Sequence, residues 1–239
     1  MDKINNCPVC GSPHITAKKS NLFVCNSCDT VFKMRDSRNS DYSTSEIYKK
    51  SIGSILEISA IVDGEEQFGT GIVISPNGHI LTCSHIISAD KESKTVVKNF
   101  CDAIIAKDKT NERIIKTEVV FSDDNLDLAI LYSEEAKKLP PITISNNRVK
   151  TGERICAIGN SKGEGLCIVD GIVSDSRRTL GDNDYIVISA PVTSGYSGGP
   201  VFNTKGSIIG IIKGGRDGAV AMNYSIPSKI ISSFLENRI

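Results

Sequence analysis

The chain has 239 residues, of which 39% are hydrophobic, and its formal net charge is zero. This composition excludes a wholly disordered protein and gives no strong electrostatic attraction to nucleic acid or to an anionic membrane. No run of about 18 apolar residues is present, so no membrane-spanning helix is expected. The residues after Met1 lack the apolar core of a secretory signal, which predicts a cytoplasmic location.

Two Cys-x-x-Cys pairs lie near the N-terminus, Cys7 with Cys10 and Cys25 with Cys28, with fourteen residues between the pairs. Two residues between the cysteines of a pair let both thiolates reach one ion from a tight turn, and four thiolates suit a closed, structural zinc site. Residues 1–35 therefore resemble a zinc ribbon, with one zinc ion per chain and these four cysteines as ligands. A module this small is expected to gain most of its folding free energy from the metal.

Three alternatives for these cysteines are a disulfide pair, an iron–sulfur site, and a zinc site in which His14 replaces one thiolate. The charge of the zinc ribbon indicates what kind of partner it binds. Residues 1–50 contain eight lysine or arginine residues and five acidic ones. With Phe23 and Phe32 among them, the segment is compatible with weak nucleic-acid binding. Because the excess of positive charge is small, docking of a protein partner or regulator is the favoured role.

Residues 36–50 are predicted to form a linker followed by a short helix. Serine and aspartate are frequent from Asp36 to Ser45, as is typical of linkers. Thr44 or Ser45 is expected to cap a helix that runs through Lys50.

From residue 51 to residue 239, short β-branched runs alternate with turn residues. This pattern predicts a mostly β domain without a layer of helices. Near the end, over residues 228–238, apolar residues recur at helical spacing, which predicts a C-terminal helix with Ser228 as its N-cap.

A β-hairpin is predicted for residues 69–85, where two apolar runs flank a Pro-Asn-Gly turn. His85 follows the returning strand, where a rigid scaffold can aim its side chain. Asp127 precedes an apolar run, and its charge is costly to bury there unless it is hydrogen-bonded. A histidine N–H is a suitable partner, so His85 and Asp127 are expected to pair.

Ser197 lies in the run Gly195-Tyr196-Ser197-Gly198-Gly199-Pro200. Glycines on both sides let the backbone turn tightly and leave the hydroxyl at an open surface. Taken alone, the run is equally compatible with an ordinary glycine turn. A serine nucleophile needs a base, however, and the base needs an orienting carboxylate; the chain supplies His85, Asp127 and Ser197 in that order.

These three segments resemble the trypsin-like (chymotrypsin-fold) serine peptidases, and most closely their HtrA/Deg branch. The resemblance covers roughly residues 46–239 and implies two six-stranded antiparallel β-barrels, at about 52–140 and 145–225, followed by the C-terminal helix. It implies a triad of His85, Asp127 and Ser197, with the backbone N–H groups of Gly195 and Ser197 as the oxyanion hole. The chain is expected to have no PDZ domain.

The predicted function is a serine endopeptidase that cleaves protein or peptide substrates, has no membrane partner, and is targeted or regulated by the zinc ribbon. A catalytically idle scaffold whose zinc ribbon binds nucleic acid or protein is the alternative.

Tyr196 stands where trypsin-type zymogens have an aspartate, so activation by N-terminal cleavage is not expected. The remaining cysteines are interpreted as reduced and mostly buried, namely Cys83, Cys101, Cys156 and Cys167.

Overall fold

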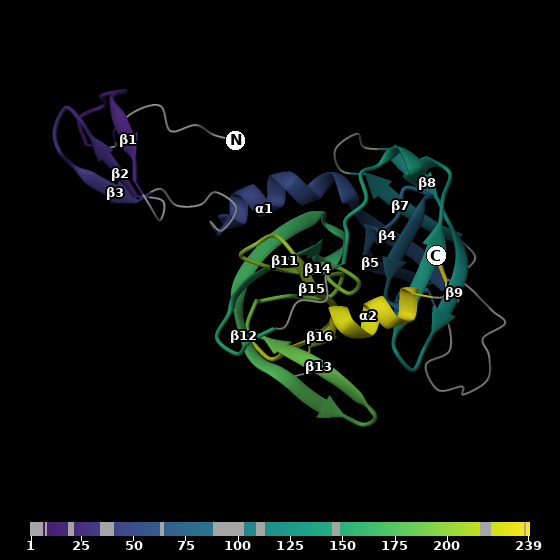
Figure 1. The fold of residues 1–239 in the computed structure, drawn as a ribbon. Helices are drawn as coiled ribbons and strands as arrows, with labels where there is room; N and C mark the ends of the chain where they lie inside the picture. Colours follow the sequence, from purple (N-terminus) through teal and green to yellow (C-terminus); the bar gives the residue numbers. More distant parts are fainter. Residues whose placement is uncertain are drawn as a thin grey trace. The chain divides into compact units, whose positions relative to one another are not determined.

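The chain divides into two compact units, Met1–Asp41 and Tyr42–Ile239, which we call the cysteine unit and the β unit (Figure 1). The computed structural model describes residues 7, 9–18, 22–33, 41–62, 65–87, 103–108, 113–144, 149–215, 221–236 and 238–239. Residues 36–40 of the predicted linker, and Cys101, lie outside the described residues.

The cysteine unit contains a three-stranded antiparallel sheet with the order β1-β2-β3. Its strands are β1 (Ile15–Ala17), β2 (Leu22–Cys25) and β3 (Val31–Lys33). Strand β1 pairs with β2, and β2 pairs with β3, so that β2 is the central strand. The rings of Phe23 and Phe32 stack across β2 and β3 with their centroids 6.0 Å apart, so both aromatic residues are used within the sheet.

The β unit begins with the helix α1 (Thr44–Ser51). Ser43 caps this helix: its hydroxyl accepts the N–H of Glu46, and the Glu46 carboxylate accepts the N–H of Ser43 at 2.8 Å. The predicted caps, Thr44 and Ser45, are therefore wrong, because the reciprocal bond with Glu46 is available only one residue earlier.

A seven-stranded sheet follows, with the order β8-β7-β4-β5-β6-β10-β9. Its strands are β4 (Ile55–Val62), β5 (Glu65–Val73), β6 (His79–Thr82), β7 (Ala103–Asp108), β8 (Arg113–Lys116), β9 (Glu118–Asp123) and β10 (Leu128–Tyr132). The antiparallel pairing of β5 with β6 confirms the predicted hairpin that leads to His85. The apolar run over 114–121 is divided between β8 and β9, which lie at opposite edges of the sheet.

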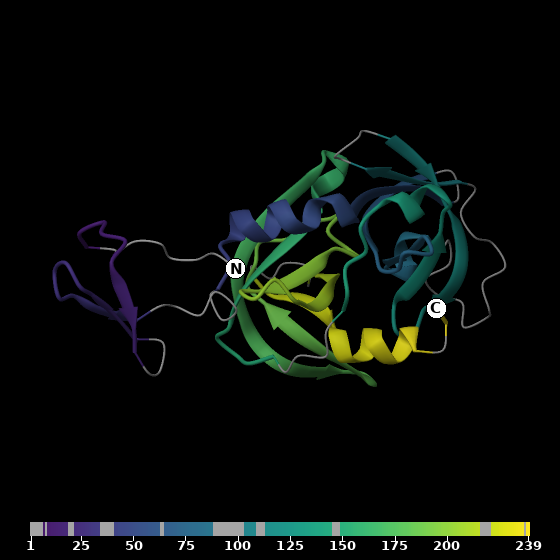
Figure 2. The same ribbon diagram turned by 45° about the horizontal axis from the view of Figure 1, so that its top comes forward.

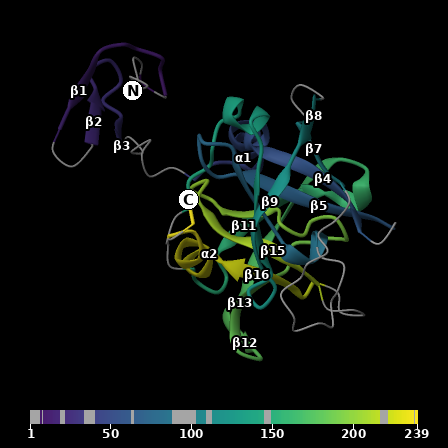
Figure 3. The same cartoon turned by 90° about the vertical axis from the view of Figure 1, so that its right-hand side faces the viewer.

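The six remaining strands form a closed barrel with the order β11-β12-β13-β16-β15-β14. They are β11 (Arg154–Asn160), β12 (Leu166–Leu180), β13 (Asn183–Ile188), β14 (Pro200–Asn203), β15 (Ile208–Gly215) and β16 (Asn223–Pro227). The long β12 and β13 form a hairpin that projects from the barrel (Figures 1 and 3). A pair of six-stranded barrels is thus not confirmed, since the described pairings of the first sheet give seven strands in an open order.

The C-terminal helix α2 (Ser228–Leu235) joins the core of the β unit from the side opposite α1 (Figure 2). Phe234 is buried, and its ring centroid lies 5.7 Å from that of Phe121 on β9. The structure is therefore mostly β with a short C-terminal helix, as expected. The helix ends before residue 238, and its N-cap is Pro227, so the predicted cap Ser228 is the first helical residue instead.

Apolar residues from both sheets and from α2 form one continuous buried cluster, which includes Ile58, Leu131, Phe202, Ile211 and Phe234. A second cluster fills the interior of the barrel. Two of the dispersed cysteines, Cys83 and Cys156, are buried as expected, whereas Cys167 is exposed. Cys167 alternates with inward-facing neighbours on β12, and the period of two places its side chain on the outer face.

Candidate active site

His85 lies in a 3-10 helix, Ser84–Ile86, directly after strand β6. Its Nδ1 is 2.8 Å from Oδ1 and 2.9 Å from Oδ2 of Asp127. The histidine side chain is 31% exposed, whereas that of Asp127 is 5% exposed. The pair expected from the sequence is therefore present, and it leaves Nε2 as the ring nitrogen that can exchange a proton with another group.

Asp127 precedes β10 in a left-handed conformation with φ 58°, which is uncommon for a residue other than glycine. Besides His85 Nδ1, its carboxylate accepts hydrogen bonds from the backbone N–H of His85 at 3.1 Å, the hydroxyl of Ser84 at 3.2 Å and Nζ of Lys213 at 2.9 Å. Burial opposes ionisation of this carboxyl, but His85 and Lys213 outweigh it and lower the pKa of Asp127. Asp127 is therefore a buried carboxylate that carries its charge at neutral pH.

Ser197 lies in the loop between β13 and β14, where Gly195 and Gly198 have φ values of 92° and 85°. A Cβ atom on Gly198 would lie 2.1 Å from the carbonyl oxygen of Thr70 and 3.2 Å from the N of Cys83. The serine loop thus passes directly beside the end of β6 that carries His85. The hydroxyl of Ser197 donates to the carbonyl oxygen of Lys213 at 3.1 Å.

Thr70 on β5 holds this loop with both its backbone and its side chain. Its N–H donates to the carbonyl of Ser197 at 2.8 Å, and its hydroxyl donates to the carbonyl of Gly195 at 2.8 Å while accepting the N–H of Asn160 at 2.9 Å. Sequence reasoning missed Thr70. The only signal was its place between Gly69 and Gly71, where bulky neighbours would block such a close approach.

The predicted oxyanion donors lie in the same loop, on either side of Tyr196. Within the part of the chain that the structure describes, the N–H groups of Gly195 and Ser197 have no hydrogen-bond acceptor. Tyr196 itself is 2% exposed, and its ring packs against Gly159 of β11. The aromatic anchor of Tyr196 therefore supports the loop from the barrel side, without the ion pair that an aspartate would need.

Lys213 on β15 was also missed, because nothing in its own neighbourhood marks it. Its Nζ contacts Asp127 although the two residues are 86 positions apart in the chain. Burial of the ammonium opposes its charge, but Asp127 raises the pKa of Lys213 overall. Lys213 thus brings a permanent positive charge to the His85–Asp127 pair.

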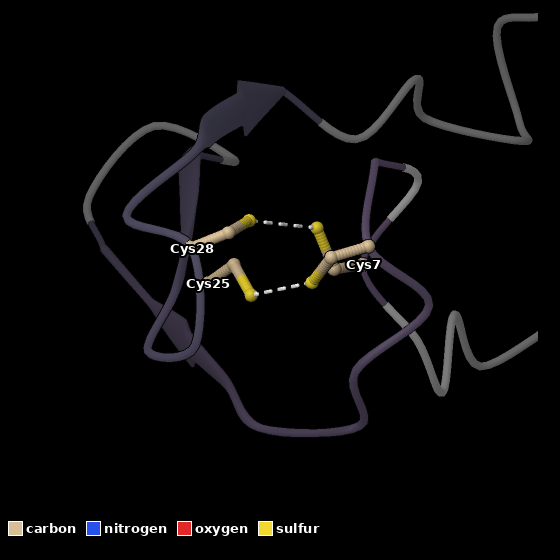
Figure 4. A group of neighbouring side chains, drawn as sticks. Cys7, Cys25 and Cys28 are labelled. Atoms are coloured by element: carbon tan, nitrogen blue, oxygen red, sulfur yellow. Dashed lines mark hydrogen bonds between the residues drawn. The ribbon is translucent and has the colours of Figure 1, made fainter.

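The four N-terminal cysteines form a separate cluster in the cysteine unit, with their sulfur atoms within 4.8 Å of one another (Figure 4). Sγ of Cys7 lies 3.8 Å from that of Cys28, and Sγ of Cys10 lies 3.5 Å from that of Cys25. Hydrogen bonds from Thr30 lower the pKa of the Cys28 thiol to about 6. These four side chains could hold a metal ion, and His14 is not in the cluster.

The fold is that of a trypsin-like peptidase domain. Residues 69–211 match the family described as the trypsin-like peptidase domain, so the chain belongs to this family. The predicted enzyme class, that of trypsin-like hydrolases, is confirmed.

Two curated relatives are named probable periplasmic serine endoprotease DegP-like. The protein from Rhizobium meliloti is 29% identical over 178 residues, and that from Brucella suis is 32% identical over 179 residues. Each match covers 72% of this chain but 33% of the relative, so the chain spans about a third of the length of these proteins.

Two solved structures have the same fold. The serine endoprotease from Yersinia pestis superposes with a TM-score of 0.69 at 25% identity, over 84% of this chain and 68% of the other. The HtrA-type protease AlgW with tripeptide gives a TM-score of 0.69 at 25% identity, over 82% and 65% of the two chains.

The names of the relatives contradict the cytoplasmic location expected from the first residues, since they point to the periplasm. Among the described residues, no helix has the length and apolar character needed to cross a membrane.

Proposed function

We propose that the β unit is an HtrA-like serine endopeptidase in which Ser197 is the nucleophile, His85 the general base and Asp127 the residue that orients His85. The observation that carries this proposal is the buried Asp127 carboxylate, bonded to His85 Nδ1 beside the serine loop that Thr70 holds. A carboxylate on Nδ1 fixes the tautomer in which Nε2 is free to accept a proton and stabilises the positive charge that follows.

In the proposed reaction the Ser197 hydroxyl attacks the scissile carbonyl carbon while His85 Nε2 takes its proton. The N–H groups of Gly195 and Ser197 stabilise the negative oxygen of the tetrahedral intermediate. His85 then gives its proton to the leaving amine, and an acyl-enzyme remains on Ser197. A water molecule, deprotonated by His85, completes the hydrolysis.

The resting hydroxyl of Ser197 donates to the carbonyl of Lys213, so it must rotate about its Cα–Cβ bond before attack. A single staggered rotation of this kind has a low barrier, and catalytic hydrogen bonds in proteins without substrate are often formed only in the complex. The same contact is the observation that favours the alternative function, an idle scaffold in which the serine never reaches His85.

A fluorophosphonate probe separates the enzyme from the scaffold. The proposal expects covalent labelling of Ser197 in the wild type, abolished by Ser197→Ala and by His85→Ala. Ser207→Ala is the matched control, because it removes a serine hydroxyl from the turn between β14 and β15 and leaves the triad intact. Absence of labelling in a folded wild-type protein would favour the scaffold.

The cysteine unit is proposed to be a zinc ribbon with Cys7, Cys10, Cys25 and Cys28 as ligands. The donor set fits: four sulfur atoms converge on one point, and the N–H groups of Val9 and Ser27 each donate to a cysteine sulfur at 3.4 Å. Such a closed four-thiolate site is structural and offers no position for catalysis. The unit would then dock a protein partner or regulator, or bind nucleic acid weakly.

Elemental analysis with a count of free thiols tests this assignment. One zinc per chain, lost in the double variant Cys25→Ser with Cys28→Ser and retained in Cys167→Ser, is expected. Absence of zinc together with two disulfides would contradict it, since oxidised cysteines cannot ligate the metal.

A further inference from the structure

Lys213 contacts two of the three proposed triad residues at once. Its Nζ lies 2.9 Å from Oδ2 of Asp127, and its carbonyl oxygen accepts the Ser197 hydroxyl at 3.1 Å. The register of β15 against β16 shifts between Ile212 and Gly214, so Lys213 occupies an irregular position in the strand. That irregularity lets one residue direct its side chain to one triad member and its backbone to another.

The Lys213 ammonium competes directly with His85 for the same oxygen. Oδ2 of Asp127 is 2.9 Å from Nδ1 of His85 and 2.9 Å from Nζ of Lys213. The side chains of Lys213 and Asp127 are 35% and 5% exposed, so solvent screens this ion pair less than a surface pair. Much of the negative charge of the Asp127 carboxylate, which contacts His85, is therefore already paired with a cation.

We propose that Lys213 is a positioning residue that sets the pH range of the peptidase by offsetting the charge of Asp127. This inference rests on the proposed triad. Protonated His85 gains less from a carboxylate that a second cation already neutralises, and it is repelled by the ammonium. The activity is therefore expected to extend further to the acid side than it would with Asp127 alone.

Among the residues that the structure describes, the other groups facing this pair add no competing charge. Cys83, at the end of β6, is fully buried, its thiol donates to the carbonyl of Ile212 at 3.3 Å, and burial raises the pKa of that thiol well above its usual range. On β13, the Tyr185 ring centroid lies 5.7 Å from Nζ of Lys213 and offers the face of a neutral phenol. The balance at the site thus involves Asp127, His85 and Lys213.

The first test is the pH dependence of kcat/KM for a quenched peptide with Lys213→Met, Lys213→Gln and Lys213→Arg. In Lys213→Met, the midpoint of the acid limb is expected to rise by about one pH unit, so that well below it the wild type is about tenfold more active. Lys213→Arg, which keeps the charge, should retain the wild-type midpoint. Lys137→Met is the matched control, because Lys137 pairs with an acidic residue, Glu134, on the surface away from the triad.

Lys213→Gln separates charge from hydrogen bonding, since glutamine can still donate to Asp127 but carries no charge. A shift like that of Lys213→Met supports the proposal. A wild-type midpoint in Lys213→Gln, or an unmoved midpoint in both neutral variants, overturns it, because the lysine would then act only as a structural donor.

NMR titration of the histidine ring protons gives a second readout that needs no activity. The chain has three histidines, so variants of the other two assign the His85 signal. An upward shift of the His85 titration midpoint in Lys213→Met, together with no measurable cleavage by the wild type, would support the electrostatic role while refuting the proposed peptidase. Equal midpoints in the wild type and Lys213→Met would refute the role of Lys213 and leave the peptidase standing.

Discussion

The cysteine unit and the β unit reach an ordered structure by different means. Among the described residues of the cysteine unit, only Cys7 and Cys25 are buried, and both are members of the sulfur cluster. The β unit buries long stretches of β-branched side chains in two apolar clusters. Order in the first unit thus depends on what holds four sulfurs together, and order in the second depends on packing. The two should respond to different perturbations.

Metal removal is expected to have the largest effect, and only on the cysteine unit. Loss of the four-thiolate site would cost this unit on the order of 10 kcal/mol and unfold it. Peptide cleavage should continue, because no triad residue belongs to that unit. Limited proteolysis and cleavage of a quenched peptide, both with and without chelator, measure the two outcomes. Loss of cleavage while circular dichroism reports an intact β unit would break the comparison.

A fragment of the β unit extends the same test without chelator. It should begin at Asp41, because the N–H of Tyr42 donates to the carbonyl of Thr204 at 2.7 Å and Ser43 caps α1. The fragment is expected to keep its peptide cleavage. A longer truncation that removes Tyr42 and Ser43 serves as the control and should be less stable, by about 1 kcal/mol for the lost cap.

Loss of the nucleophile or the base is the next largest effect, and it should leave both units folded. Ser197→Ala and His85→Ala are each expected to lower kcat by about 10⁴-fold to 10⁶-fold. The double variant should be little worse than either single variant, because the two residues act in one step. Steady-state kinetics with an active-site titration measures this, and fully additive losses would mean that they do not act together.

Truncating one aromatic residue in each unit compares the two sources of stability directly. Phe234→Ala in α2 should lower the free energy of unfolding of the β unit by about 3–5 kcal/mol, since the ring is 2% exposed. Phe23→Ala in the metal-loaded cysteine unit should cost much less, because that ring is only half-buried. Urea unfolding followed separately for each unit gives both values. Equal costs would mean that packing also holds the cysteine unit.

Thr70→Val tests how firmly the serine loop is held within the β unit. Valine keeps the shape and the backbone bond to Ser197 but leaves the buried carbonyl of Gly195 and the N–H of Asn160 without the hydroxyl. The expected loss is about 1–3 kcal/mol in stability, with a fall in kcat. Thr70→Ser keeps the hydroxyl and should behave like the wild type. A fully active Thr70→Val protein would show that the loop needs no such support.

Acidification should produce the smallest effect, and again in the β unit. The pKa of Asp127 is lower in the folded chain than its ordinary value. Such a carboxyl stabilises the fold at pH values above its unfolded pKa and loses that contribution as the pH falls through its folded pKa. The stability advantage of the wild type over Asp127→Asn should therefore shrink on acidification below about pH 4. Urea unfolding from pH 3 to pH 7 measures it, and an advantage independent of pH would contradict this linkage.

His85, Asp127 and Ser197 could be predicted as site residues because each lies in a short motif, although the contact between His85 and Asp127 joins residues 42 positions apart. Thr70 and Lys213 could not, since their contacts join residues 125 and 86 positions apart and depend on how two sheets meet. Likewise, the apolar run at 114–121 gave no sign that β8 and β9 separate to opposite edges of one sheet. Local patterns determine the strands, whereas strand order is decided by packing between distant segments.

The closed barrel has a consequence for the time at which the protein acquires activity during synthesis. Strand β13 pairs with β16, which is synthesised after β14 and β15. A nascent chain that already contains Ser197 therefore still lacks the strand that closes the barrel, and α2 follows later still. Because domains fold as units, we expect the growing chain to carry every proposed catalytic residue and yet hydrolyse nothing until β16 and α2 have emerged.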